Sequence, residues 1–193
     1  KLLETEFKVP RGKIEWTRKN REVKQVYLEH TLMVANFMVC LEIACKHKRG
    51  VELIPEDEIH KIFTTRIDKE QNIGWKLTIE RNSGKRNKSY NLSIIPDKAF
   101  ALYFPNDPPG KNQALFFLEA DRSTMPVIRS SLYRSSFYKK LVGYWESYQQ
   151  NLFQKYFGFK GARMLTVAKS VQRVDNIITA NKQVDSRKKG SKM

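Results

Sequence analysis

The clearest pattern of hydrophobic and polar positions lies in residues 21–47. Apolar side chains recur there every three or four positions, from Val23 through Val34 to Leu41. This spacing places them on one face of an α-helix. Basic residues followed by Gly50 are typical of a helix end. We therefore predict one long helix over residues 21–47, followed at residues 53–63 by a short segment with a proline start and a helical turn.

From residue 74 the pattern changes to the alternation that is typical of β-strands. Strands are predicted at residues 75–80, 89–104 and 113–121, with turn-forming segments at 81–88 and 105–112 between them. Pro96 lies inside the second strand and has no N–H for a strand ladder, so it marks a strand end, an edge or a bulge.

Helical spacing returns at residues 132–157, and it is followed by a strand at 162–170 and a terminal helix at 171–183. Strands joined by tight turns are antiparallel, whereas a strand–helix–strand passage implies a parallel crossover. The predicted fold class is α/β, with a central mixed β-sheet flanked by helices.

The predicted domain organisation has three parts. Residues 1–20 are basic and interrupted by proline and glycine, so we interpret them as an arm or as the end of an upstream module. The chain starts at Lys1 rather than Met, which we interpret as the start of a fragment. Residues 21–183 form the α/β domain, and residues 184–193 form a basic, disordered tail.

Charge changes the picture more than any other bulk property. The chain has 36 Lys and Arg against 20 Asp and Glu, a formal net charge of +16 over 193 residues. Such an excess points to a polyanionic partner, most often a nucleic acid. We expect no membrane span, because no apolar run reaches the ~18–20 residues that a bilayer requires. Two cysteines without zinc-type spacing fit a reducing cytoplasm.

The candidate chemistry lies in residues 115–126, "LFFLEADRSTMP", where an apolar strand ends in Glu119-Ala120-Asp121. Two carboxylates at positions i and i+2 of a strand point to the same face of the sheet. Asp97 ends the preceding strand, so a hairpin would bring it close to Glu119. One interpretation is a Mg²⁺ or Mn²⁺ site for phosphodiester chemistry. The other is that these acids cap strands or pair with nearby cations.

A longer set of motifs resembles a known family. The segments "IIPDKAFAL", "LFFLEADRSTMP", "YKKLVGY" and "RMLTVAKSVQRVDNII", with the helix "LEHTLMVANFMVCLEIA" before them, are similar to the replication-relaxation family of bacterial plasmids and related mobile elements. The resemblance covers about residues 25–180. It implies a role in plasmid replication and DNA relaxation, and partners that include DNA and other replication or mobilisation proteins. An upstream winged-helix module is common in that family.

The order of elements in the family is similar to the restriction-endonuclease-like fold, whose motif is an Asp followed by Glu-x-Lys on the next strand. By position, the resemblance implies Asp97 and Glu119 as metal ligands. This chain departs from the motif, because Asp121 occupies the position of the lysine. Asp121 would be a third metal ligand, or Lys139 or Lys140 from the following helix would supply the missing positive charge.

The remaining candidates carry weaker signals. His30 lies on the apolar stripe of the first helix and matches a histidine that the family tends to keep, although a core histidine is the default interpretation. Glu42 lies at the flank of the same stripe. It is interpreted either as an extra metal ligand or as a solvated glutamate. A tyrosine nucleophile of the relaxase type is disfavoured, because the sequence has no metal-binding histidine cluster. The predicted DNA-binding residues are Lys85, Arg86, Lys88, Arg122, Arg134, Lys139, Lys140 and Arg173.

Three functions follow from these observations. The first is a DNA-binding protein of plasmid or mobile-element replication with a nuclease-like core and metal-dependent DNA nicking. The second is a non-catalytic DNA-binding adaptor with a degenerate nuclease fold, which the aspartate in place of lysine favours. The third and weakest is an RNA-binding protein.

Overall fold

The computed structural model describes residues 25–62, 73–83 and 86–190. The helices are α3 (Gln25–His47), α4 (Glu56–Ile62), α5 (Phe137–Gln149), α6 (Leu152–Phe157) and α7 (Val171–Gly190). The strands are β1 (Glu52–Ile54), β2 (Trp75–Ser83), β3 (Arg86–Ile94), β4 (Lys98–Tyr103), β5 (Gln113–Asp121) and β6 (Ala162–Ala168). The predicted arm, residues 1–20, lies outside the described residues.

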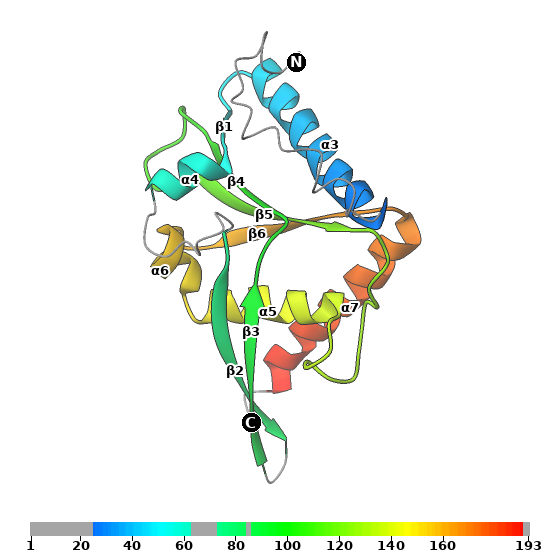
Figure 1. The fold of residues 1–193 in the computed structure, drawn as a ribbon. Helices are drawn as coiled ribbons and strands as arrows, with labels where there is room; N and C mark the ends of the chain where they lie inside the picture. The colour runs from blue at the N-terminus through cyan, green and yellow to red at the C-terminus, as the bar shows by residue number, and fades with distance from the viewer. Residues whose placement is uncertain (1–24, 63–72, 84–85, 191–193) are drawn as a thin grey trace, which may run out of the picture.

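The central sheet has four strands in the order β1-β4-β5-β6. β4 pairs antiparallel with both β1 and β5, whereas β5 and β6 are parallel. Figure 1 shows α3 and α4 on one side of this sheet and α5 and α7 on the other. The prediction of a mixed sheet flanked by helices, with a parallel crossover through the 132–157 region, is therefore confirmed.

Strands β2 and β3 form a separate two-stranded ribbon, which pairs from Trp75↔Ile94 to Ser83↔Arg86. Residues 89–104 were predicted as strand, with Pro96 marking a strand end, an edge or a bulge, and the structure has two strands there that belong to different sheets. The chain leaves the ribbon after Ile94 and enters the central sheet at Lys98, and Pro96 lies in the break. Alternation continues across this break, so periodicity alone does not reveal it.

Three other boundaries differ from the sequence predictions. The helix expected over residues 132–157 is two helices, because Asn151 adopts a left-handed conformation with φ of 53°. β1 was not predicted, and its three residues are too few for a periodic signal. The helix expected to end at 183 extends to Gly190, and Val184 is buried, so residues 184–190 belong to α7 rather than to a disordered tail.

An aromatic cluster joins the ribbon to the sheet and to α5. The Trp75 ring lies 5.0 Å from Phe117 of β5 and 5.8 Å from Tyr144 of α5, and its indole N–H donates to the buried Ser147 hydroxyl at 2.7 Å. Burying one large apolar side chain contributes about 1.5–3 kcal/mol. Gly143 permits the close approach of α5, since a Cβ there would lie 2.3 Å from Ile94 Cδ1.

Helix α3 packs on the opposite side of the sheet, with the rings of Phe37 and Phe100 6.2 Å apart. Its outer surface exposes several large apolar side chains, namely Tyr27, Leu28, Leu32, Val39 and Ile43. The stretch Tyr27–His47 is long and apolar enough to cross a membrane by length and composition. The length and composition of one helix do not establish a membrane span.

Candidate functional site

The predicted acidic residues gather where β4 begins and β5 ends. β4 and β5 pair with Lys98 opposite Leu118, and the Asp97 N–H donates to the Leu118 carbonyl at 3.0 Å. One further step of this register sets Asp97 beside Glu119. The structure therefore brings these two carboxylates together at one end of the sheet.

Glu119 is the most buried of the acids, with 1% of its surface exposed. Its Oε2 accepts a hydrogen bond and ion pair from Lys140 Nζ, and its Oε1 accepts from the Tyr144 hydroxyl at 2.7 Å. Burial raises the pKa of Glu119, because removal from water penalises the charged form. Lys140 and Tyr144 oppose this effect, whereas the negative charge of Asp97 adds to it.

The Tyr144 hydroxyl is held in the same environment. Its pKa lies well above the ordinary value, because the group is buried and next to the carboxylate of Glu119. Tyr144 is therefore a hydrogen-bond donor to Glu119 and stays protonated at neutral pH. Lys140 and Tyr144 are four residues apart on α5, the spacing at which two side chains share a helix face.

Asp97 uses both of its carboxylate oxygens. Oδ1 lies 3.1 Å from His30 Nε2, and Oδ2 accepts the backbone N–H of Ala120 at 2.7 Å. The His30 side chain is 26% exposed, so it is a partly buried partner of Asp97 at the edge of the sheet. The default interpretation of His30 as a core histidine does not describe this contact.

Asp121 is paired with Arg173 at the start of α7. Arg173 Nε contacts Asp121 Oδ2, its Nη2 lies 3.2 Å from Oδ1, and Ser123 N–H donates to Oδ1 at 3.1 Å. Arg173 also donates to the Met125 carbonyl at 2.5 Å. The guanidinium is thus directed at Asp121, and both side chains are almost completely buried.

The fit of this cluster to a divalent cation can be tested from its donors. Mg²⁺ binds carboxylate oxygens that are free to coordinate. Glu119 and Asp97 each have both oxygens occupied by protein donors, and Asp121 is held by Arg173. Within the ranges that the structure describes, no three His, Cys, Asp or Glu residues converge in a metal-binding group. A cation at Asp97 and Glu119 would therefore compete with these protein donors for the carboxylate oxygens.

Other predicted residues lie apart from this cluster. Glu42 pairs with Lys46 at 2.7 Å on the exposed surface of α3. It lies twelve residues from His30, about 18 Å along the helix at ~1.5 Å per residue. The backbone N–H of Lys139 donates to Ser136 Oγ, which caps α5. Its side chain is half-buried.

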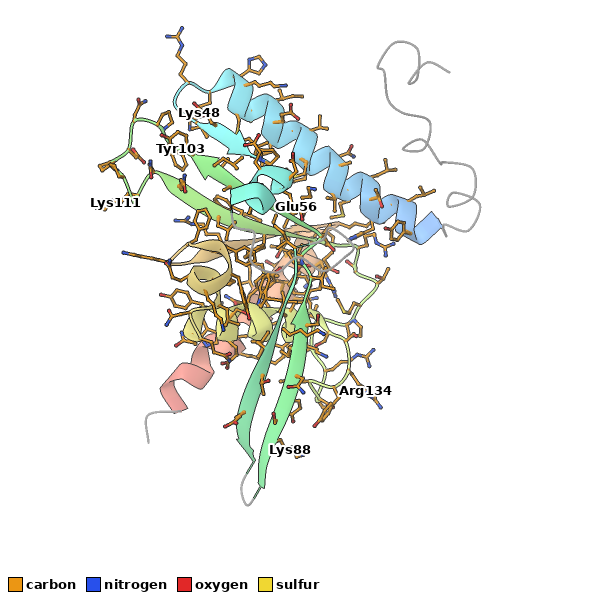
Figure 2. The ribbon with its side chains drawn as sticks, turned by 60° about the vertical axis from the view of Figure 1, so that its left-hand side comes forward. Lys48, Glu56, Lys88, Tyr103, Lys111 and Arg134 are labelled. Atoms are coloured by element: carbon orange, nitrogen blue, oxygen red, sulfur yellow. The ribbon has the colours of Figure 1, made fainter. Side chains whose placement is uncertain are left out.

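The predicted DNA-binding residues divide by environment. Lys88 and Arg134 are exposed at the ribbon end of the molecule, where Figure 2 labels them. Arg122 is half-buried next to Asp121. Lys85 and the side chain of Arg86 lie outside the described residues. Of the remaining three, Lys139 is half-buried, and Lys140 and Arg173 are paired with acids.

A model of the replication-relaxation family matches residues 1–162. The chain belongs to the replication-relaxation family. The match includes all three acids and Lys140, and it ends at the start of β6, so Arg173 lies beyond it. No curated protein and no solved structure matches the chain.

Family membership suggests a role in plasmid or mobile-element replication. The restriction-endonuclease-like assignment stays a prediction, while the mixed α/β sheet is established. Sequence reasoning missed three pairings of the acids: Tyr144 with Glu119, Arg173 with Asp121, and His30 with Asp97. The four-residue spacing of Lys140 and Tyr144 was a signal for the first. For the second, the pairing of Asp121 with an arginine 52 residues later, no local signal exists.

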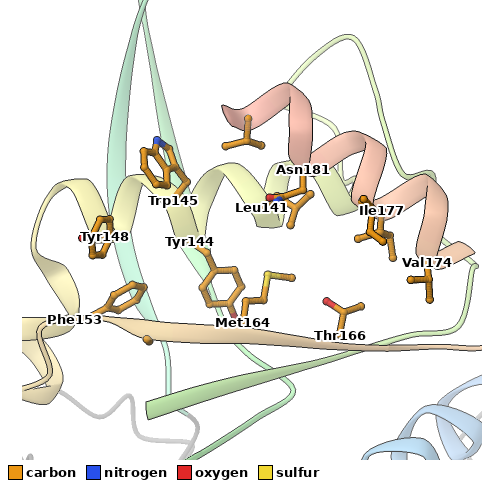
Figure 3. Close-up of a pocket in the computed structure, with 13 residues that line it drawn as sticks. Leu141, Tyr144, Trp145, Tyr148, Phe153, Met164, Thr166, Val174, Ile177 and Asn181 are labelled. Carbon is orange, nitrogen blue, oxygen red and sulfur yellow. The ribbon is translucent and has the colours of Figure 1, made fainter. Parts of the chain in front are cut away.

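The replication-relaxation domain also has a largely apolar pocket of about 480 Å³ between α5, β6 and α7. Figure 3 shows Tyr144, Met164 and Ile177 around it, with Thr166 and Asn181 as polar side chains in the lining. The ring of Tyr144 lines the pocket while its hydroxyl donates to Glu119. The pocket therefore borders the acidic cluster.

Proposed function

We propose that this replication-relaxation protein binds DNA during plasmid or mobile-element replication, and that its acidic cluster maintains the fold rather than cutting DNA. The observation that carries DNA binding is the net charge of +16. Counterion release makes phosphate contact by lysine and arginine the main source of affinity for DNA without sequence preference.

The distribution of charge supports a cationic face. Residues 81–96 contain four Lys and Arg and no acid, and residues 122–145 contain five and no acid. The first segment belongs to the ribbon, and the second leads from β5 into α5. Tyr90 of the first contacts Tyr133 of the second, with ring centroids 4.8 Å apart, so the two acid-free segments adjoin.

The structural role of the acids is supported by their partners. Lys140 and Arg173 neutralise two buried carboxylates, and removing one partner of a buried pair costs about 3–5 kcal/mol. A phosphate that recruited either cation would leave a buried acid unpaired. DNA contact is therefore expected from the exposed cations, such as Lys88 and Arg134.

Fluorescence anisotropy with a labelled duplex, titrated from about 50 to 200 mM salt, tests this proposal. We expect binding to persist in EDTA. The logarithm of the binding constant should fall linearly with the logarithm of the salt concentration. Arg134→Ala should lower the slope by about one unit per lost phosphate contact. Lys111→Ala is the matched control, because Lys111 is exposed at the opposite end of the molecule (Figure 2). Absence of binding at 50 mM salt would overturn the proposal.

A second candidate function is DNA nicking with Mg²⁺ or Mn²⁺ at Asp97 and Glu119. The observation that favours it is the electrostatic coupling of the two carboxylates, since Asp97 contributes to the raised pKa of Glu119. A cation would have to displace Lys140 and Tyr144 from the Glu119 oxygens. Incubating supercoiled plasmid with Mn²⁺ and counting open circles decides between the functions. Nicking that disappears in Glu119→Gln, with fold and DNA binding retained, would establish the second function in place of the structural role.

A further inference from the structure

The β2–β3 ribbon changes character along its length. Near its base, one face carries Trp75, Leu77 and Ile79, whose side chains are buried against the domain. Two residues further along the same face, the register sets Arg81 opposite Lys88. Figure 1 shows that the ribbon extends past α5. The buried apolar positions thus give way to the exposed Lys88 further along the ribbon.

This arrangement is unfavourable for an isolated protein. Like charges at directly opposed positions of an antiparallel pair destabilise the pairing. Within the described ribbon, the nearest acid along β2 is Glu80, which alternation places on the opposite face, and β3 contains none. A polyanion is the ligand that would offset such a repulsion.

Aromatic rings lie next to these charges. Tyr90 follows Lys88 by two residues and so lies on the same face of β3. Its ring contacts that of Tyr133, at a centroid distance of 4.8 Å. Tyr133 is nevertheless 70% exposed, and Arg134 follows it in the chain. The exposed Tyr133 ring, with Arg134 next in the chain and Lys88 on the strand of the contacting Tyr90, combines a stacking surface with phosphate-binding groups.

The turn that presents Tyr133 is held by three hydrogen bonds. Its N–H donates to Ser131 Oγ at 3.2 Å, and the Arg134 N–H donates to the Ser131 carbonyl at 3.3 Å. Arg129 Nε donates to the Ser135 carbonyl at 3.0 Å, closing the same turn. A ring that is already positioned loses less conformational freedom on binding than one on an unrestrained loop.

We propose that Lys88, Tyr90, Tyr133 and Arg134, the ribbon platform, bind single-stranded DNA. Bases stack on Tyr133 while the two cations contact the flanking phosphates. This inference rests on the proposed DNA-binding function and specifies the form of DNA and the place of contact. Single strands are favoured over duplex because paired bases do not offer their faces to a ring, whereas unpaired bases stack on aromatic side chains with little sequence preference.

The test compares a labelled dT₁₂ oligonucleotide with a duplex of equal length by anisotropy at several salt concentrations. Tyr133→Ala should weaken dT₁₂ binding about tenfold, with an unchanged salt slope, because stacking releases no counterions. Tyr133→Phe keeps the ring and should bind like the parent. Tyr27→Ala is the matched control, since Tyr27 is 62% exposed on α3.

The charged positions provide a second readout. Lys88→Ala and Arg134→Ala should each lower the salt slope for dT₁₂ by about 0.7, the value for one phosphate contact on a single strand. Circular dichroism and thermal melting of each variant show whether the fold is retained. These exposed positions contribute little to the core, so folded variants are expected.

The outcomes separate this inference from the function on which it rests. Wild-type protein that binds duplex but not dT₁₂ would overturn the ribbon platform and leave DNA binding standing. Protein that binds neither would overturn both. Equal loss in Tyr133→Ala and Tyr27→Ala, or tighter binding to U₁₂ RNA than to dT₁₂, would also refute single-stranded DNA binding at Tyr133.

Discussion

Replacing Lys140 with methionine tests whether the buried carboxylate of Glu119 is stabilised by its ion pair. Methionine keeps the length and the apolar stem of lysine but removes the charge. In the variant, Glu119 would retain the Tyr144 hydroxyl as donor and lose the ammonium group of Lys140. Because Glu119 is 1% exposed, the unpaired charge has little access to water.

The size of the effect follows from burial. Removing one partner of a fully buried pair costs about 3–5 kcal/mol. The Lys140 side chain is 32% exposed, so solvent already screens part of the pair and water can enter the vacated space. We therefore expect a loss of about 2 kcal/mol in the free energy of unfolding. For a domain of this size that corresponds to a decrease in Tm of roughly 4–8 °C.

The pH dependence gives the sharper test. The folded-state pKa of Glu119 is raised above 4.5, so the folded protein binds its proton more tightly than the unfolded chain. The protonated form of Glu119 therefore stabilises the folded state. This contribution to the free energy of unfolding is fully present below pH 4.5 and is lost as the pH rises through the folded-state pKa. Lys140 lowers that pKa, so Lys140→Met raises it further and extends the loss upward. The penalty should be smaller at pH 5 than at pH 8.

Urea denaturation followed by tryptophan fluorescence at both pH values measures this difference. Lys111→Met is the control for loss of an exposed lysine. In the double variant Lys140→Met/Glu119→Gln no charge remains to be buried, so part of the lost stability should return and the penalty should no longer change with pH. A Lys140→Met variant as stable as the parent at both pH values would refute the argument.

Three further predictions concern other contacts and use the same urea assay. Arg173→Met should lower the free energy of unfolding by about 3–5 kcal/mol, because Asp121 is 5% exposed and would lose its guanidinium partner. A loss below about 1 kcal/mol would show that the hydrogen bond from the Ser123 backbone N–H is enough to stabilise the buried carboxylate. Gly143→Ala should cost about 1–3 kcal/mol, since its Cβ would lie 2.3 Å from the end of the Ile94 side chain; a neutral result would mean that this side chain moves aside without cost. Trp75→Phe should cost about 1–3 kcal/mol through the lost hydrogen bond to a buried hydroxyl, and an unchanged midpoint would contradict that role.

The sequence predictions succeeded where one periodicity extends over several turns or a whole strand. The helix at 25–47 and the strand at 113–121 were predicted closely, because each is a long segment with a strong apolar pattern. Pro96 indicated a strand end, an edge or a bulge, but the passage of the chain from the ribbon to the central sheet was not predicted, because period-two alternation does not report which sheet a strand joins. The helix break at Asn151 depends on one left-handed residue, and periodicity is insensitive to it.

The candidate site was predictable in its members more than in its connections. The hairpin register that sets Asp97 beside Glu119 follows from two strands joined by a turn. The choice between Lys139 and Lys140 depends on helix rotation, since successive residues point ~100° apart and only one of them faces the strand. The partners of Asp97 and Asp121 come from α3 and α7, far away in the chain. Such pairings need the tertiary structure.

The three acids at this sheet end share one physical logic. Each is held by a basic side chain from a different helix: a histidine of α3, Lys140 of α5 and Arg173 of α7. Carboxylates that are this buried require compensation, so the pairs also tie the helices on both sides of the sheet to the same strand ends. The cations predicted for DNA binding therefore fall into two chemical groups. Lys140 and Arg173 are committed to acids, and taking either for a phosphate would cost more than one exposed phosphate contact returns. Exposed cations such as Lys88 and Arg134 carry no such cost, which is why DNA contact is expected at the ribbon and not at the acidic cluster.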